Sequence, residues 1–204
     1  MLNELLTRHF KIMSSGLSEV PQGAQCRALN ETNQELRNLY LEMMNFPNET
    51  NPHTSEIINE VNINSCSISN GRPAGRWPTV YYVSFHDGRY STAPSNGVYP
   101  VVFLTADHSF TWTGINVSIT ELGLAAENSQ SAKARKKVES AARLWASGVV
   151  LPDDWTKGPL ALGHNGNRLE HGTRGVGPAY EVGSVGGFRS RLGDPTNFLY
   201  HIIN

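Results

Sequence analysis

Apolar residues recur at helical spacing in the first third of the chain. A stripe at positions three or four apart predicts an amphipathic helix that ends near residues 14–16. This stripe consists of Leu2, Leu5, Leu6, Phe10 and Met13. A second helix is predicted from about Asn30, which can cap it, to the residues before 45–47. We expect both helices to serve packing rather than catalysis.

A high content of Val, Tyr and Phe predicts strands over residues 79–86 and 98–105, which a turn-forming segment separates, and residues 109–119 predict a third. Period-two geometry places Tyr82 on the same strand face as Ser84, and Tyr99 on the same face as Phe103. If the two faces coincide, we expect three aromatic rings to converge.

The remaining segments are predicted from helix formers, glycines and turn residues. Residues 129–147 predict a helix with a basic cluster, and residues 45–70 predict a long loop. Short strands are predicted around residues 179–182 and 187–189, and a last helix is predicted after Pro195. The predicted fold is α+β, with a twisted, largely antiparallel sheet flanked by helices. The helices and linker of residues 1–70 form an N-terminal appendage, which we expect to make one compact unit with a core of residues 71–204.

Length and composition fit one domain with its own hydrophobic core. The 204 residues include only two cysteines, Cys26 and Cys66, in no metal-binding spacing, which favours a reduced, cytoplasmic setting. Charged residues interrupt the first apolar stretch, and no later apolar run is long enough to span a bilayer. We therefore expect no membrane, metal or cofactor to be involved.

The charge of the chain is distributed unevenly. The net charge of −1 divides into −4 over residues 1–70 and +3 over residues 71–204. Such an imbalance permits a basic surface in the second part, although many of these charges can simply solvate the protein.

An aromatic set and a Gly/Arg turn occur together in residues 71–104. Tyr82, Tyr99 and Phe103, with Trp77 and Ser84 nearby, predict a pocket for a planar base, since aromatic side chains stack on bases. Ordinary core packing is the alternative for each of these rings. Glycine allows close backbone approach to a phosphate, and arginine supplies charge. We therefore interpret Arg72, Gly75, Arg76 and Arg89 as DNA backbone contacts.

The segments GRWPTVYYVSF, STAPSNGVYPVVFL and ITEL, with Asp107 between the last two, resemble the N-terminal DNA-binding domain of McrB-type modification-dependent restriction systems. That family shows an Ile-Pro-Trp strand, a loop of small residues, and Asn-Gly-Ile-Tyr-Pro followed by an apolar strand. The resemblance is close over residues 71–122 and weak elsewhere.

The resemblance implies a phage-defence module that binds double-stranded DNA carrying 5-methyl- or 5-hydroxymethylcytosine and flips the modified base into an aromatic pocket. The pocket positions of the family fall on Tyr82, Tyr99 and Phe103. Two departures bear on which modification fits: Tyr82 replaces the usual tryptophan and follows Tyr81 rather than proline, and Phe103 is bulkier than leucine. Cleavage or NTPase activity is then expected in a fused domain or a partner subunit.

Further cations are candidates for contacts with DNA phosphates. They are Lys133, Lys136 and Lys137 on the predicted basic helix, and Arg189 in the glycine-rich region. A solvated surface is the alternative for all four.

Two other classes of function stay open. GHNGNRLEHG, with His164 and His171, has some likeness to a metal-dependent HNH nuclease, but its spacing is too short for the strand, turn and helix of such a site. We expect no catalytic residues in the chain itself. In the third reading the chain is a protein-interaction module, and its aromatic residues are only core.

Overall fold

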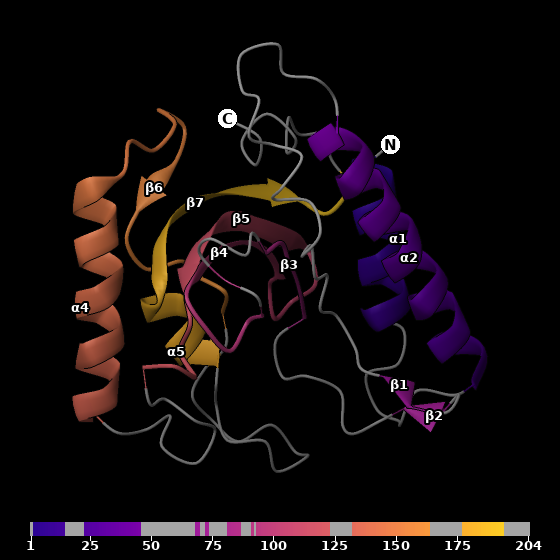
Figure 1. Ribbon diagram of the computed structural model, residues 1–204, viewed down its shortest axis with the longest axis horizontal. Coiled ribbons are helices and arrows are strands. Elements are labelled where there is room, and N and C mark those ends of the chain that lie inside the picture. The colour runs from indigo at the N-terminus through magenta and orange to yellow at the C-terminus, as the bar shows by residue number, and fades with distance from the viewer. Residues whose placement is uncertain are drawn as a thin grey trace.

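The computed structural model describes residues 2–14, 23–45, 68–69, 72–73, 81–86, 91, 93–122, 132–163 and 177–193 (Figure 1). A five-stranded antiparallel sheet forms its centre. In spatial order the strands are β3 (Tyr82–Ser84), β4 (Val98–Leu104), β5 (Phe110–Val117), β7 (Ser184–Arg191) and β6 (Thr156–Lys157). A separate pair joins β1 (Ile68–Ser69) to β2 (Arg72–Pro73). The predicted α+β class, with an antiparallel sheet and flanking helices, is confirmed.

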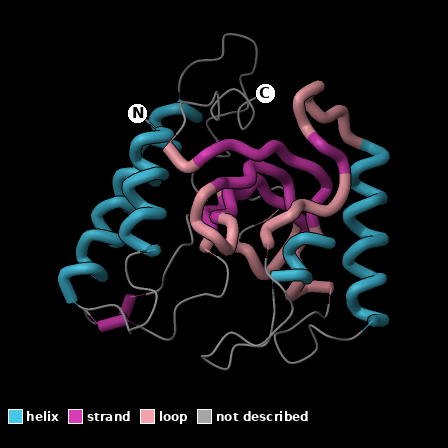
Figure 2. Tube along the Cα trace, turned by 180° about the vertical axis from the view of Figure 1, so that it is seen from behind, coloured by secondary structure: helices cyan, strands magenta, loops and turns pink. Residues whose placement is uncertain are grey.

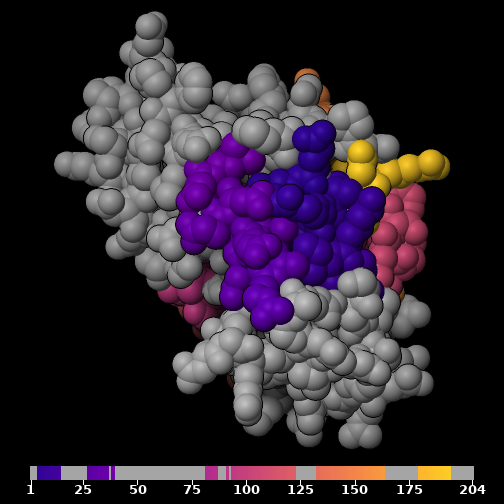
Figure 3. Space-filling model, turned by 90° about the vertical axis from the view of Figure 1, so that its right-hand side faces the viewer, coloured from indigo at the N-terminus to yellow at the C-terminus, as the bar shows by residue number. Residues whose placement is uncertain are grey.

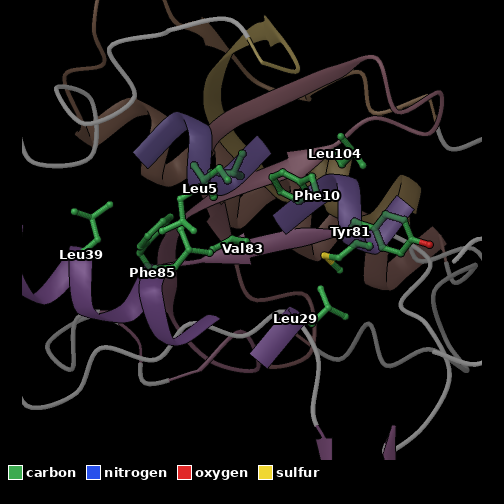
Figure 4. Close-up of a cluster of buried hydrophobic side chains, with 12 residues drawn as sticks. Leu5, Phe10, Leu29, Leu39, Tyr81, Val83, Phe85 and Leu104 are labelled. Carbon is green, nitrogen blue, oxygen red and sulfur yellow. The ribbon is translucent and has the colours of Figure 1, made fainter. Parts of the chain in front are cut away.

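The helices α1 (Leu2–Ser14) and α2 (Gly23–Asn45) pack together against one face of the sheet. Their apolar stripes meet Val83, Phe85, Val102 and Leu104 in a buried cluster, part of which is labelled in Figure 4. Figure 3 shows the two helices side by side on the surface above this cluster. The second helix begins well before the predicted start, so Asn30 is an exposed residue within it rather than its cap.

The helix α4 (Ala132–Gly148) lies at the opposite end of the molecule from α1 and α2, with the sheet between them (Figures 1 and 2). Its buried residues Val138 and Ala142 share a cluster with Val117 and Val185 of the sheet. The predicted helix over residues 129–147 agrees with α4 to within a few residues.

One predicted strand is wrong. Residues 179–182 belong to the short helix α5 (Gly177–Val182), whose end is marked by a hydrogen bond from the amide of Gly183 to the carbonyl of Ala179, 3.0 Å long. The tyrosine and valine of this segment favour a strand locally. Packing of Ala179 into the cluster beneath α4 selects the helix instead. The strand predicted over 187–189 is present and longer, as β7.

Paired glycines allow the two central strands β5 and β7 to approach closely. A Cβ atom on Gly114 would lie 2.4 Å from the carbonyl oxygen of Gly186, and one on Gly187 would lie 2.4 Å from the oxygen of Thr113. Any larger residue at either position would collide with the backbone of the neighbouring strand. Gly114 and Gly187, which lie in two of the predicted strands, therefore allow these strands to pair closely.

None of the helices in the described ranges is both long and apolar enough to cross a membrane. The long loop predicted over residues 45–70 and the helix predicted after Pro195 lie almost wholly outside those ranges.

Candidate functional site

Four residues form a row across neighbouring strands of the sheet. Tyr82 pairs with Phe103, Phe103 pairs with Trp112, and Trp112 pairs with Arg189. Paired residues point to the same side of a sheet, so the row lies on one face, opposite the face covered by α1 and α2. Tyr99 is four positions before Phe103 and shares that face. The strand face that carries Tyr82 therefore coincides with the face that carries Tyr99 and Phe103. The expected convergence of three rings depended on this.

Three of the aromatic rings on this face are in mutual contact. The ring centroids of Tyr82 and Phe103 are 6.2 Å apart, and Tyr180 of α5 lies 6.0 Å from Tyr82 and 5.4 Å from Phe103. We call Tyr82, Phe103 and Tyr180 the aromatic triad. Sequence reasoning missed Tyr180, because its segment was assigned to a strand and no pattern connected it with residues eighty positions earlier.

The exposure of these rings divides them into a floor and a rim. Phe103 is 0% exposed and Tyr99 is 1% exposed, so both form the floor. Tyr82 and Tyr180 are half-buried and form the rim. Within the aromatic triad, only Tyr82 and Tyr180 therefore have surface that solvent can reach.

Burial also determines the protonation of the tyrosine hydroxyls. It raises the pKa of Tyr82, Tyr99 and Tyr180, and repulsion from an ionised Tyr82 would raise the latter two further. All three hydroxyls therefore stay protonated near neutral pH and can donate hydrogen bonds. The hydroxyl of Tyr99 donates to the carbonyl of Pro94 at 3.3 Å.

A buried chain of hydrogen bonds runs beside Tyr99. The Nδ1 and Nε2 atoms of His86 lie 2.8 Å from the hydroxyls of Ser91 and Ser84, respectively. Ser91 in turn donates to the backbone carbonyl of Asn96, 2.8 Å away, so it accepts from Nδ1–H, and Ser84 donates to Nε2. Burial lowers the pKa of His86 to about 4, which keeps the ring neutral.

This chain of hydrogen bonds explains the position of Ser84, a predicted pocket residue. Its side chain is on the same face as Tyr82, but it is 0% exposed and its hydroxyl proton is directed to His86. The distance of 2.8 Å between the hydroxyl of Ser84 and Nε2 of His86 is that of a nucleophile and a base. Neither side chain, however, is exposed to solvent. The network instead holds Ser91 and Asn96 against the end of β3.

An extended segment, residues 158–163, crosses the same face beside the aromatic triad. Leu160 and Leu162 pack against Tyr99 and Phe103. The carboxylate of Glu181 accepts hydrogen bonds from the amides of Leu162 and Gly163, at 2.8 and 3.1 Å. Trp112 donates from Nε1 to the carbonyl of Ala161 at 2.9 Å. We call residues 158–163 the crossing segment.

The predicted backbone-contacting cations lie on separate elements. Arg189 ends the row that contains Tyr82 and Phe103, is exposed, and lies over the ring of Phe110 at 3.6 Å. Lys133, Lys136 and Lys137 are exposed on α4. The remaining candidates, Gly75, Arg76, Trp77, Arg89 and the side chain of Arg72, lie outside the described residues, as do His164 and His171.

Within the described ranges, no three His, Cys, Asp or Glu side chains are grouped so that they could hold a metal ion. Comparisons with protein-family models, with curated proteins and with solved structures give no match to this chain.

Proposed function

We propose that the chain is a DNA-binding recognition module that reads modified cytosine in duplex DNA by accepting the flipped base between aromatic side chains. The observation that carries the proposal is the aromatic triad on the sheet face opposite α1 and α2, with its two half-buried tyrosines. The resemblance of residues 71–122 to the McrB-type DNA-binding domain supports the same assignment.

The free energy that base flipping costs has to be returned by contacts within an aromatic pocket. Flipping a base from the duplex costs a few kcal/mol, and stacking on an aromatic side chain returns roughly 1–3 kcal/mol per base. A base held between Tyr82 and Tyr180 would contact two rings, and the protonated hydroxyls could donate to its edge. These contacts together are of the size needed to offset extrusion.

Admission of a base requires a small movement of the rim. A base between two rings needs about 7 Å between their planes, twice the usual contact distance of carbon atoms. The rings of Tyr82 and Tyr180 are 6.0 Å apart and inclined by 42°. Rotation of one tyrosine side chain into a parallel orientation, together with a separation of the two rings by roughly 1 Å more, would create the slot, while Phe103 and Tyr99 stay in place as its floor.

Among the described cations, Arg189 lies in the same cross-strand row as Tyr82 and Phe103. Its guanidinium is held flat on Phe110, and in this position it can donate to a phosphate. We therefore assign Arg189 to the DNA backbone. In this proposal the module acts in the cytoplasm and a fused or partner effector cleaves the DNA.

The test is a binding comparison at fixed salt across duplexes that differ at one position. The position carries plain, 5-methyl-, 5-hydroxymethyl- or glucosylated cytosine, and a fifth duplex carries N6-methyladenine. We expect tighter binding to one class of modified cytosine than to plain duplex. Equal affinity for all five duplexes, or no binding to any, would refute the proposal.

A further inference from the structure

Helix α5, which carries the rim residue Tyr180, is too short to fix its own position. It comprises six residues, Gly177–Val182, and leads directly into β7 (Figure 1). An isolated helix of this length is not stable in water, because nucleation costs more than one turn of hydrogen bonds returns. Contacts with the rest of the protein must therefore determine where α5 lies, and with it the ring of Tyr180.

Glu181 ties α5 to the crossing segment. Its Oε1 atom accepts hydrogen bonds from the amides of Leu162 and Gly163, at 2.8 and 3.1 Å. Its backbone carbonyl accepts a third hydrogen bond, from the amide of Leu160 at 3.3 Å. Hydrogen bonds to an ionised carboxylate are stronger than those between neutral groups. The residue that follows Tyr180 is therefore attached to the crossing segment through both its side chain and its backbone.

The backbone of the crossing segment is shaped to receive this carboxylate. In an extended chain, successive amides point in opposite directions. Gly163 instead has a φ of 76°, in the left-handed region, and its amide converges with that of Leu162 on one oxygen atom. Successive amides that converge in this way form a concave site for an anion, and glycine adopts the required conformation without strain. The carboxylate of Glu181 occupies such a site.

The crossing segment is itself held on the sheet. The amide of Gly158 donates to the carbonyl of Val185 at 3.2 Å, and Trp112 donates from its indole to the backbone of the segment. The two leucines of the segment are buried against the floor residue Phe103. The tie through Glu181 therefore fixes α5 relative to the floor on which a base would rest.

We propose that Glu181 is a positioning residue of the base-binding site, which holds Tyr180 at the spacing from Tyr82 from which the slot can open. This inference rests on the proposed function. The two rings are 6.0 Å apart, close to the separation of about 7 Å that a base needs. Without the tie, the ring of Tyr180 would sample many positions, and fixing it on binding would cost conformational entropy. The modified base would then bind less tightly, whereas plain duplex, which does not occupy the slot, would bind as before.

Alanine at position 181 tests the role of the tie in recognition. Glu181→Ala should lower the preference for the best modified duplex over plain duplex by about fivefold or more, with little change in affinity for plain duplex. Glu181→Gln keeps an acceptor oxygen and should restore most of the preference. Glu121→Ala is the matched control, because its carboxylate accepts from the amide of Gly97 at 2.6 Å, at the end of β4 away from Phe103. An unchanged preference in Glu181→Ala, or an equal fall in Glu121→Ala, would overturn the inference.

A measurement without DNA separates failure of this inference from failure of the proposed function. The rings of Tyr82 and Phe103 lie 6.0 and 5.4 Å from that of Tyr180 and displace its NMR signals. In Glu181→Ala these signals should move toward those of an exposed tyrosine, and in Glu121→Ala they should not. Unchanged signals would overturn the inference whatever the DNA results. If the signals move but the parent chain prefers no modified duplex, the positioning of Tyr180 is upheld and the proposed function is refuted.

The crossing segment offers a second variant that leaves Glu181 intact. Gly163→Ala strains the left-handed backbone that presents the two amides, so it should move the Tyr180 signals and lower the preference in the same direction. Gly158→Ala is its control, because Gly158 also has a left-handed φ, of 94°, and its amide is bonded to Val185 rather than to Glu181. Effects of equal size in the two variants would mean a general loosening of the segment and would overturn the inference.

Discussion

His9 Nδ1 lies 2.7 Å from the hydroxyl of Thr32, and this buried contact joins α1 to α2. The threonine donates its own proton to the carbonyl of Leu29 at 3.0 Å, so His9 donates from Nδ1 and is neutral. Its Nε2 atom is buried and has no hydrogen-bond partner within the described structure. Burial lowers the pKa of His9 to about 4.

The two buried histidines make stability depend on pH. His9 and His86 each have a pKa of about 4 when folded, against 6.5 in the unfolded chain. The unfolded chain therefore binds protons first as the pH falls. The free energy of unfolding should be highest above pH 6.5 and should fall between pH 6.5 and 4, by about 3 kcal/mol for each histidine.

Urea unfolding at pH 7.5, 5.5 and 4 measures this loss. His9→Gln removes one titrating group, so the variant should lose about 3 kcal/mol less than the parent over this range. The remaining acid sensitivity belongs to His86 and to the carboxylates. An identical pH dependence in the variant would show that His9 does not titrate as described.

The rim tyrosines should control discrimination between modified and plain DNA. Tyr82→Ala or Tyr180→Ala removes a stacking surface, so the preference for modified duplex should disappear while weak, salt-sensitive binding remains. Fluorescence anisotropy at two salt concentrations measures both quantities. Tyr81→Phe is the matched control, because Tyr81 belongs to the cluster on the opposite face. A preference that survives both alanine changes would show that neither ring contacts the base.

Phe103 should affect folding more than recognition. It is 0% exposed, so Phe103→Ala leaves a cavity and should lower the free energy of unfolding by about 3–5 kcal/mol. Phe103→Leu keeps most of the volume and should lose less than about 1.5 kcal/mol. Chemical denaturation separates the two outcomes. Similar losses for alanine and leucine would mean that the ring is not packed as a floor.

Arg189 should contribute affinity without specificity. Arg189→Gln removes a cation near the aromatic triad, so binding to plain and modified duplexes should weaken by the same factor, and the salt dependence should become shallower. Phe110→Leu removes the ring on which the guanidinium rests and should give a smaller loss of the same kind. Isothermal titration at several salt concentrations tests both variants. A loss confined to modified duplex would place Arg189 at the base instead.

The glycines of the central strands should tolerate no side chain. Gly114→Ala and Gly187→Ala each place a methyl group 2.4 Å from a backbone oxygen, which should destabilise the fold by about 1–3 kcal/mol or more. Gly148→Ala is the control, because no atom lies within 4 Å of its Cβ position and alanine favours a helix. Thermal unfolding should show lower melting temperatures for the first two variants and an unchanged or higher one for the control.

Local sequence patterns predicted the helices and strands of this protein better than the contacts between them. Val, Tyr and Phe content located β4 and β5 to within one or two residues. Period-two geometry placed Tyr82, Tyr99 and Phe103 on their correct strand faces. It could not locate Tyr180, because contact between α5 and β4 depends on the tertiary path of the chain. It also gave Ser84 a role in contacting a base, whereas its hydroxyl is directed to His86, a contact that depends on the rotamers of both side chains.

Charge patterns showed which segments contain many cations, but they did not show which of these cations lie on the same element or surface. Four of the cations considered for one partner are exposed in the described residues, but Arg189 lies on β7 and the three lysines lie on α4. The apolar residues of the helix predicted over residues 129–147 include Val138, which is buried, and Leu144, which is exposed, and the sequence alone does not distinguish the two. Only the direction in which α4 docks onto the sheet separates them.

Glu181 connects two parts of the protein that surround the aromatic triad. Its carboxylate belongs to the same helix as Tyr180, yet it holds the amides of Leu162 and Gly163, and Leu162 in turn accepts a hydrogen bond from Ala106 at 2.9 Å. A ligand that pushes Tyr180 aside by shifting its helix would therefore pull the turn between β4 and β5 with it. Occupancy of the aromatic triad would then be transmitted mechanically to the turn that contains Ala106, just beyond the end of β4.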